Sequence, residues 1–127
     1  MEPINILKAL ADETRLRILH LLNKYDLCVC EIKTLLNLNQ SNVSRHLNRL
    51  TSVNILEYYK VSKYVYYKIS DEIITKYPFI HEVITEHAKK ISHFNDDYNR
   101  MIKYKQGGYT CDDLMEGKVC FQAIDQH

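Results

Sequence analysis

The pattern of residues 40–50 constrains the fold most strongly, because it predicts a helix with one apolar face and one polar, basic face. Val43, Leu47 and Leu50 follow the i, i+4, i+7 spacing of a core-facing stripe, and Asn39 can cap the helix. A short-chained, polar and basic outer face is what a helix lying in the major groove requires. We therefore predict a DNA-recognition helix, with an outer face formed by Gln40, Ser41, Ser44, Arg45 and Asn48.

Within this helix, Gln40, Ser44 and Arg45 are the residues we expect to contact bases or phosphates. Two neighbours have alternative roles. His46 either reaches DNA or braces the helix, because it adjoins the inward residues, and Arg49 either reaches DNA or pairs with an acidic neighbour.

The preceding residues predict three shorter helices. Ile4 to Leu10 predicts the first, and Asp12 can cap a second. Asp26 is the candidate cap of a third, and residues 37–39 form a tight turn before the recognition helix. The apolar positions repeat at helical spacing: Leu16, Leu19 and Leu22 in the second helix, and Val29, Ile32, Leu35 and Leu36 in the third.

Residues 55–69 are rich in aromatic and β-branched side chains, which predicts a β-hairpin whose two strands are linked by residues 61–63. This hairpin holds five of the ten tyrosines, most of which we expect to pack on the core. Lys60 and Lys63 lie at or near its tip, where they would face phosphate. The alternative is a hairpin that only packs.

The net charge is +1, but it is unevenly distributed. Residues 1–70 carry ten basic and six acidic side chains, a net +4, whereas residues 71–127 carry seven and ten, a net −3. The basic surface thus coincides with the predicted DNA reader and is modest, so two copies would be needed for useful affinity. No signal-peptide pattern and no membrane-length apolar run occur, so we expect a cytoplasmic protein without a membrane partner.

From Pro78 to Gly107 the sequence predicts one long helix with an apolar stripe of 3.5-residue rhythm, which is typical of helix–helix contact. We interpret the stripe as a homodimer interface. His87 within it is expected to be a hydrogen-bonded interface residue rather than a metal ligand. The stripe consists of Ile80, Ile84, His87, Ile91, Phe94, Tyr98 and Met101.

Cys28 and Cys30 stand just upstream of the recognition helix. With Asp26 as cap they would lie in a first helical turn, where the helix dipole lowers a thiol pKa and favours the metal-binding thiolate. Residues two apart are separated by about 200° around a helix. We therefore hypothesise that metal binding strains this turn and opposes DNA binding. The alternative is a pair of small buried apolar residues.

Cys111 and Cys120 are the remaining thiols, in a predicted flexible tail of residues 107–127. Three sulfurs would suit arsenite or antimonite, and all four would suit cadmium or lead. The alternative for the tail cysteines is an exposed pair without a role, or an adventitious disulfide. No organic cofactor is expected.

Three stretches resemble the ArsR/SmtB family of winged-helix metalloregulators: residues 7–19, residues 27–32 with the Cys-Val-Cys element, and residues 43–50. The resemblance covers residues 6 to about 105. It implies a mainly helical winged helix-turn-helix domain over residues 1–106, and a dimer that represses from palindromic double-stranded operators and leaves DNA when metal binds. Lys33 occupies the position of a third cysteine in one arsenic-sensing type, and residues 1–27 hold no cysteine. His81, His87 and His93 do not match the family's zinc site.

We therefore predict a repressor released by As(III) or Sb(III), with a Cd(II)- or Pb(II)-responsive repressor and a thiol redox-responsive repressor as alternatives. An enzyme is not expected, because no nucleophile–base constellation and no Cys-x-x-Cys motif in a βαβ setting is present.

Overall fold

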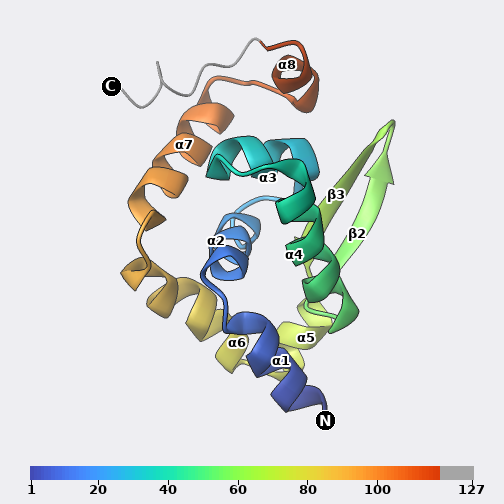
Figure 1. The fold of residues 1–127 in the computed structure, drawn as a ribbon, viewed down its shortest axis with the longest axis vertical. Helices are drawn as coiled ribbons and strands as arrows, with labels where there is room; N and C mark the ends of the chain where they lie inside the picture. The colour runs from blue at the N-terminus through green and yellow to red at the C-terminus, as the bar shows by residue number, and fades with distance from the viewer. Residues whose placement is uncertain (118–127) are drawn as a thin grey trace.

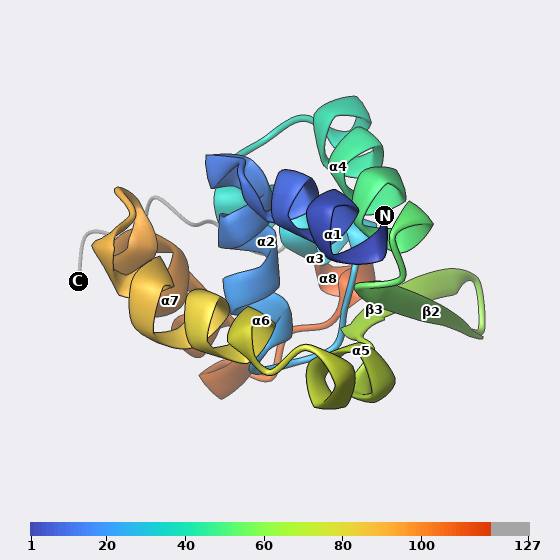
Figure 2. The same cartoon turned by 90° about the horizontal axis from the view of Figure 1, so that it is seen from below.

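The computed structural model describes residues 1–117, a helical body with a small antiparallel sheet on one side. Helix α2 lies at the centre, and the hairpin and α7 lie on opposite sides of it (Figures 1 and 2). This confirms the predicted winged helix-turn-helix class. The elements are α1 (Glu2–Leu10), α2 (Glu13–Leu22), β1 (Leu27–Cys28), α3 (Val29–Leu36), α4 (Gln40–Ser52), β2 (Leu56–Val61), β3 (Tyr64–Ile69), α5 (Asp71–Lys76), α6 (Phe79–Glu82), a π-helical turn (Val83–His87), a 3-10 turn (Ala88–Lys90), α7 (Phe94–Gln106) and α8 (Cys111–Met115).

Two of the three predicted caps are confirmed. Asp12 accepts a hydrogen bond from Arg15 N at 3.0 Å, and Asn39 accepts one from Asn42 N at 2.8 Å, so each satisfies a free amide at a helix start. Asp26 is not the cap of α3, because the β1 strand follows it and Cys28 is the N-cap. Its carboxylate instead accepts from Tyr59 OH at 2.7 Å.

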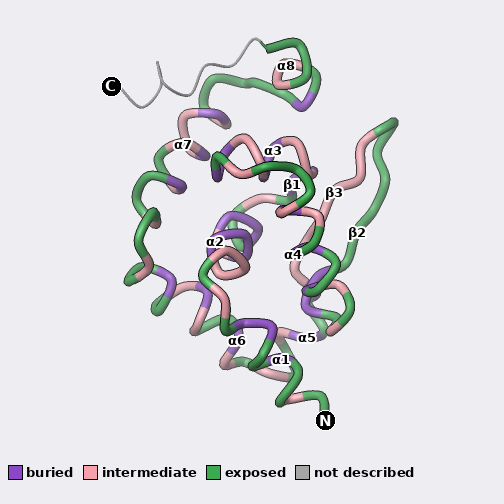
Figure 3. The backbone as a smooth tube through the Cα atoms, in the orientation of Figure 1, coloured by how far each residue is buried: buried purple, intermediate pink, exposed green. Residues whose placement is uncertain are grey.

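The predicted core stripes of α2, α3 and α4 meet in one apolar core. Leu19, Leu35, Leu47 and Leu50 are fully buried. Figure 3 shows the buried residues concentrated on α2 and on the inner sides of α3 and α4, whereas the hairpin beyond its base is exposed or half-buried. The polar face of α4 therefore lies outward, as the sequence predicts.

The hairpin is confirmed, and it gains a third strand that the sequence did not predict. The strand order is β1-β3-β2, and β1 pairs Leu27 with Tyr67 and Cys28 with Tyr66. Ser62 adopts a left-handed φ of 57° in the tip turn between β2 and β3. The short β1 strand joins the hairpin directly to the start of α3.

The prediction of one long helix from Pro78 to Gly107 is wrong. The chain leaves the helical conformation at Ile91, which is extended, and His93 has a left-handed φ of 74° before α7 begins. This break folds α7 back against α2. Within residues 1–117, no helix is both long enough and apolar enough to traverse a bilayer.

The break also corrects the predicted interface. Ile80, Ile84 and Met101 are fully buried in the core of their own chain, so they do not form a surface for a partner. The rhythm of the stripe reflects packing of two consecutive helical segments on the same core. His87 is exposed, and the remaining predicted interface residues, Ile91, Phe94 and Tyr98, are half-buried.

A buried ion pair fixes α7 on α2. Arg17 Nε donates to Asp97 Oδ2 at 2.8 Å, and Arg17 Nη2 donates to Asp97 Oδ1 and to Leu36 O, both at 2.9 Å. Arg100 Nη2 adds a bond to Asp97 Oδ1 at 2.9 Å. Asp97 is fully buried, so its charge depends on these partners.

We predict that Asp97→Ala lowers the free energy of unfolding by about 3–5 kcal/mol, because it leaves the buried Arg17 guanidinium uncompensated. Chemical denaturation would measure the change. Asp96→Ala is the matched control, because Asp96 is exposed in the same turn, and it should cost less than about 1 kcal/mol. Equal losses in the two variants would contradict the assignment.

Candidate metal centre and nucleic-acid interface

Three cysteine sulfurs converge where β1, α3 and α8 meet. Cys28 ends β1, Cys30 lies in the first turn of α3, and Cys111 begins α8. The Sγ atoms of Cys28 and Cys30 are 3.1 Å apart, and all three Sγ atoms lie within 4.8 Å of one another. Cys28 and Cys111 are buried, and Cys30 is half-buried. Three soft donors in one small space form a candidate site for a thiophilic ion.

The Sγ atoms of Cys28 and Cys111 lie within bonding distance of each other, and their Cα atoms are 7.5 Å apart. Ordinary disulfides join Cα atoms about 4.4–6.8 Å apart. The two cysteines are therefore close enough for their sulfurs to join directly or to share one ion.

The structure overturns the predicted separation of Cys28 and Cys30 around a helix. Cys28 is the N-cap of α3 and has extended backbone angles, with φ −89° and ψ 170°. Its side chain therefore turns back over the first turn, toward Cys30, instead of following the helical spiral. Both sulfurs reach one point without unwinding the turn, so the premise of the strain hypothesis is wrong. Opposition between metal binding and DNA binding stays a prediction.

Glu31 is a site residue that the sequence reasoning missed. Its Oε1 accepts from Cys28 N at 3.0 Å, and its Oε2 accepts from the hydroxyl of the fully buried Tyr104 at 2.5 Å. The carboxylate thus holds the backbone of Cys28 and ties it to α7. A glutamate three residues after an N-cap is the signature of a capping box and could have identified it.

The pKa of the Cys30 thiol is raised, not lowered as predicted. Burial is the main cause, because it penalises the thiolate, and the negative charge of Glu31 adds to it. Cys30 is therefore a protonated thiol at neutral pH, and an ion that binds it displaces a proton.

Cys111 begins a short helix, α8, within the segment predicted to be a flexible tail. Thr110 caps α8, and Asp113 Oδ2 accepts from Thr110 N at 2.8 Å in a reciprocal capping box. Helix α8 packs against α3, and Figure 1 shows it beyond the end of α7. Cys120, the fourth predicted ligand, lies outside the described residues.

The predicted DNA-binding side chains lie on the outer surface of α4 and the hairpin, except for one. Arg45 is held by a bond from its Nη2 to Asn42 Oδ1 at 2.7 Å. Ser44 is half-buried, and the remaining predicted contacts, Gln40, Ser41, Arg45, Asn48, Arg49, Lys60 and Lys63, are exposed. Contact with DNA itself stays a prediction.

His46 is the exception, and its burial favours the bracing alternative over contact with DNA. Only 4% of His46 is exposed, and its Nδ1 lies 3.2 Å from Arg15 Nη1 and 3.9 Å from Asp12 Oδ1. These contacts join α4 to the start of α2. His46 therefore positions the recognition helix.

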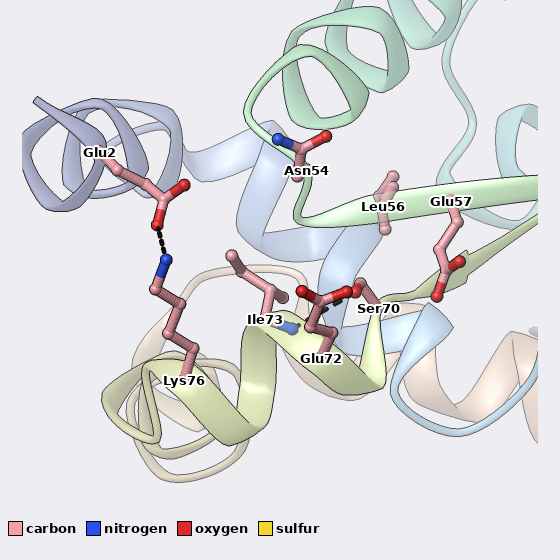
Figure 4. Close-up of a pocket in the computed structure, with 8 residues that line it drawn as sticks. All are labelled: Glu2, Asn54, Leu56, Glu57, Ser70, Glu72, Ile73 and Lys76. Carbon is pink, nitrogen blue, oxygen red and sulfur yellow. Dashed lines mark hydrogen bonds and ion pairs between the residues drawn. The ribbon is translucent and has the colours of Figure 1, made fainter.

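The cleft in Figure 4, between α1, α5 and the start of β2, is a weaker candidate site. Its volume is about 380 Å³. The Glu2 carboxylate in it pairs with Lys76 Nζ at 2.8 Å, and Ser70 Oγ accepts from Ile73 N. The cleft thus holds one neutralised pair and two further exposed carboxylates, Glu57 and Glu72, and the sulfur cluster remains the chemically distinctive site.

A helix-turn-helix with a tyrosine-rich wing and an outward basic recognition helix defines a winged-helix DNA-binding regulator. The protein-family model described as "Bacterial regulatory protein, arsR family" matches residues 12–58 of this chain. The chain belongs to the ArsR family, whose members are DNA-binding regulators rather than enzymes.

Three similar proteins bear on the site. The arsenical resistance operon repressor of Escherichia coli is 44% identical over 72 residues, covering 56% of this chain and 62% of the relative. The homologue of the cadmium resistance regulatory protein CadC in Staphylococcus aureus is 36% identical over 73 residues, covering 57% and 60%. The homodimeric winged helix-turn-helix domain Mb0332 from Mycobacterium bovis has a TM-score of 0.58 at 28% identity, covering 67% and 79%. The chain spans about three fifths of the length of the first two relatives.

We predict that the fold loses stability between about pH 7 and pH 5. Burial lowers the pKa of His46, and of His20 likewise, below the usual unfolded value near 6.5. As the pH falls through that value the unfolded chain takes up protons that the folded chain resists, so the free energy of unfolding decreases.

Denaturation of wild type and His46→Gln at the two pH values would measure this, with the exposed His81→Gln as control. The decrease should be smaller in His46→Gln and unchanged in His81→Gln. A decrease as large in His46→Gln as in wild type would contradict the bracing role.

Proposed function

We propose that this protein is a metal(loid)-responsive transcriptional repressor, which binds palindromic operator DNA as a homodimer and is released when arsenite or antimonite binds its thiolates. The observation that carries the proposal is the convergence of the Cys28, Cys30 and Cys111 sulfurs at the start of α3, the helix that packs against the recognition helix. Similarity to an arsenical resistance repressor supports it. Such a repressor acts in the cytoplasm, where its operator lies.

The number of sulfurs favours As(III) or Sb(III). Arsenite takes three thiolates in a pyramid, and the described site offers three Sγ atoms. Cadmium or lead, the alternative inducers, would be satisfied by these three sulfurs or by a fourth from Cys120. Similarity to a cadmium resistance regulator supports this alternative.

The DNA-binding surface in this proposal consists of α4 and the hairpin. Arg45 and Arg49 are exposed on α4, and Lys60 and Lys63 are exposed on the hairpin. Cations of this kind position a protein on the phosphate backbone, while short polar side chains on the recognition helix read base edges.

The dimer interface in this proposal lies on α1 and on the exposed part of the α7 region. Ile4 and Leu7 of α1 are 46% and 50% exposed, which is unusual for large apolar side chains on one helix. Half-buried Phe94 and Tyr98 line a cleft of about 280 Å³ with His20 of α2. A homodimeric protein of similar fold supports a two-fold assembly.

A thiol redox switch is a second candidate function. It rests on the bonding contact between the Cys28 and Cys111 sulfurs. This candidate predicts release from DNA by peroxide in the absence of metal, with two thiols oxidised to a disulfide as peroxide is reduced to water.

The proposed function predicts that Cys28→Ser combined with Cys30→Ser keeps operator affinity within about threefold but abolishes release by arsenite. Serine is a good N-cap, so the substitution at Cys28 preserves the start of α3. Titration of labelled operator DNA, selected by the protein from a random duplex library, would measure both properties. Release by arsenite from the double variant would overturn the proposal, and release of wild type by peroxide alone would favour the redox switch.

The proposed DNA surface predicts that Arg45→Ala weakens operator binding roughly tenfold to a hundredfold, through loss of a charged contact to base or phosphate. Lys90→Ala is the matched control, since Lys90 is an exposed cation on the 3-10 turn, outside α4 and the hairpin. The control should bind the operator almost as wild type does. Equal weakening in both variants would show that net charge alone matters.

A further inference from the structure

Helix α8 contacts the hairpin through the residue next to the sulfur ligand. Asp112 Oδ1 accepts from Tyr64 OH at 2.5 Å and lies 3.6 Å from Lys63 Nζ. Tyr66 OH lies 3.8 Å from Cys111 Sγ. One short helix therefore bridges the sulfur cluster and the tip of the wing.

The Asp112 carboxylate pairs with Lys63, a cation that belongs to the proposed DNA-binding surface. Lys63 is one of the two hairpin lysines expected to face phosphate, and its side chain is 72% exposed beside Asp112. The start of α8 also carries Asp113, and Glu116 follows the helix, so the segment presents negative charge near the wing. A phosphate and the Asp112 carboxylate would compete for the same ammonium group.

We propose that α8 is an acidic cap, which ion capture at Cys111 closes over the wing, so that Asp112 displaces a DNA phosphate from Lys63. This inference rests on the proposed function, because it needs Cys111 to join Cys28 and Cys30 around the ion. It assigns to Asp112 a role in release that is separate from ion binding.

The cap depends on its tether. An exposed ion pair in water is weak by itself, and a helix as short as α8 has little intrinsic stability. Ligation of Cys111 would hold Asp112 beside Lys63 at a high effective concentration and convert the weak contact into an effective competitor. In the structure the Cys28–Cys111 sulfur contact already holds α8 against the wing. When the thiols are reduced and carry no ion, that tether is absent, and phosphate can take the lysine.

The Cys28–Tyr66 pairing strengthens this link. Cys28 faces Tyr66 across the β1–β3 ladder, so the strand that supplies a sulfur is paired directly with the strand that carries Tyr64 and Tyr66, which α8 contacts. The small sheet thus connects the sulfur cluster, through β1, with the wing strand that α8 contacts.

Asp112→Asn tests the cap, with the exposed Asp96→Asn on α7 as a matched control for charge. Operator affinity of each full-length protein would be measured without metal, with arsenite and, in parallel, with cadmium. Thiolate–metal charge-transfer absorption would report ion binding in the same samples. We expect wild-type absorption in both variants, but a roughly threefold to tenfold smaller loss of DNA affinity on loading in Asp112→Asn only.

The outcomes separate the two proposals. Normal absorption with wild-type release in Asp112→Asn would overturn the cap and leave the proposed function standing. Absence of thiolate–metal absorption in wild type with either ion would overturn the proposed function, and the metal-dependent cap with it.

A carbodiimide coupling experiment provides a geometric readout. This reagent joins a carboxylate and an amine in contact as an amide, with loss of water. We expect a Lys63–Asp112 cross-link, identified by mass spectrometry, that increases when arsenite or cadmium is added and is absent in Asp112→Asn. An equal yield with and without the ion would contradict metal-dependent closure.

Discussion

The junction at Cys28 is the constraint on which the site depends. This residue ends a two-residue strand paired to the hairpin and also caps α3, so its backbone is extended where the next residue is helical. The Glu31 carboxylate stabilises that conformation by accepting a hydrogen bond from the Cys28 amide, and it also accepts one from the hydroxyl of the buried Tyr104. Because of this conformation, two cysteines at a spacing unsuited to a single helix can face one ion. The junction also places the sulfurs where α3, which packs on the recognition helix, meets the sheet of the wing.

A second restraint keeps the C-terminal segment close to the site. The buried Arg17–Asp97 pair fixes α7 on α2, and the chain then turns at Gly107 and Gly108 to bring Cys111 back over α3. Gly108 has a φ of +71°, which glycine adopts without steric cost. The packing of α7 and the turn at Gly107 and Gly108 therefore bring the Cys111 sulfur to Cys28, which is 83 residues away in the sequence.

The local elements could be predicted from the sequence because local chemistry determines them. The Asp12 and Asn39 caps, the inward stripe of α4 and the tyrosine-rich hairpin all depend on neighbours within a few residues. What failed depends on distant contacts. The two-residue β1 strand needs Tyr66 and Tyr67 as partners, and the break at His93 and the burial of His46 are settled by tertiary packing. A stripe with 3.5-residue rhythm does not reveal whether it faces a partner or its own core.

The central claim is that Cys28, Cys30 and Cys111 together hold one thiophilic ion. X-ray absorption at the arsenic edge of the arsenite-loaded protein tests it most directly, by counting the sulfurs around the ion. The account predicts three sulfurs in wild type and two, completed by a lighter atom, in Cys111→Ser. An ion surrounded by oxygen or nitrogen alone, or a sulfur count unchanged by Cys111→Ser, would contradict it.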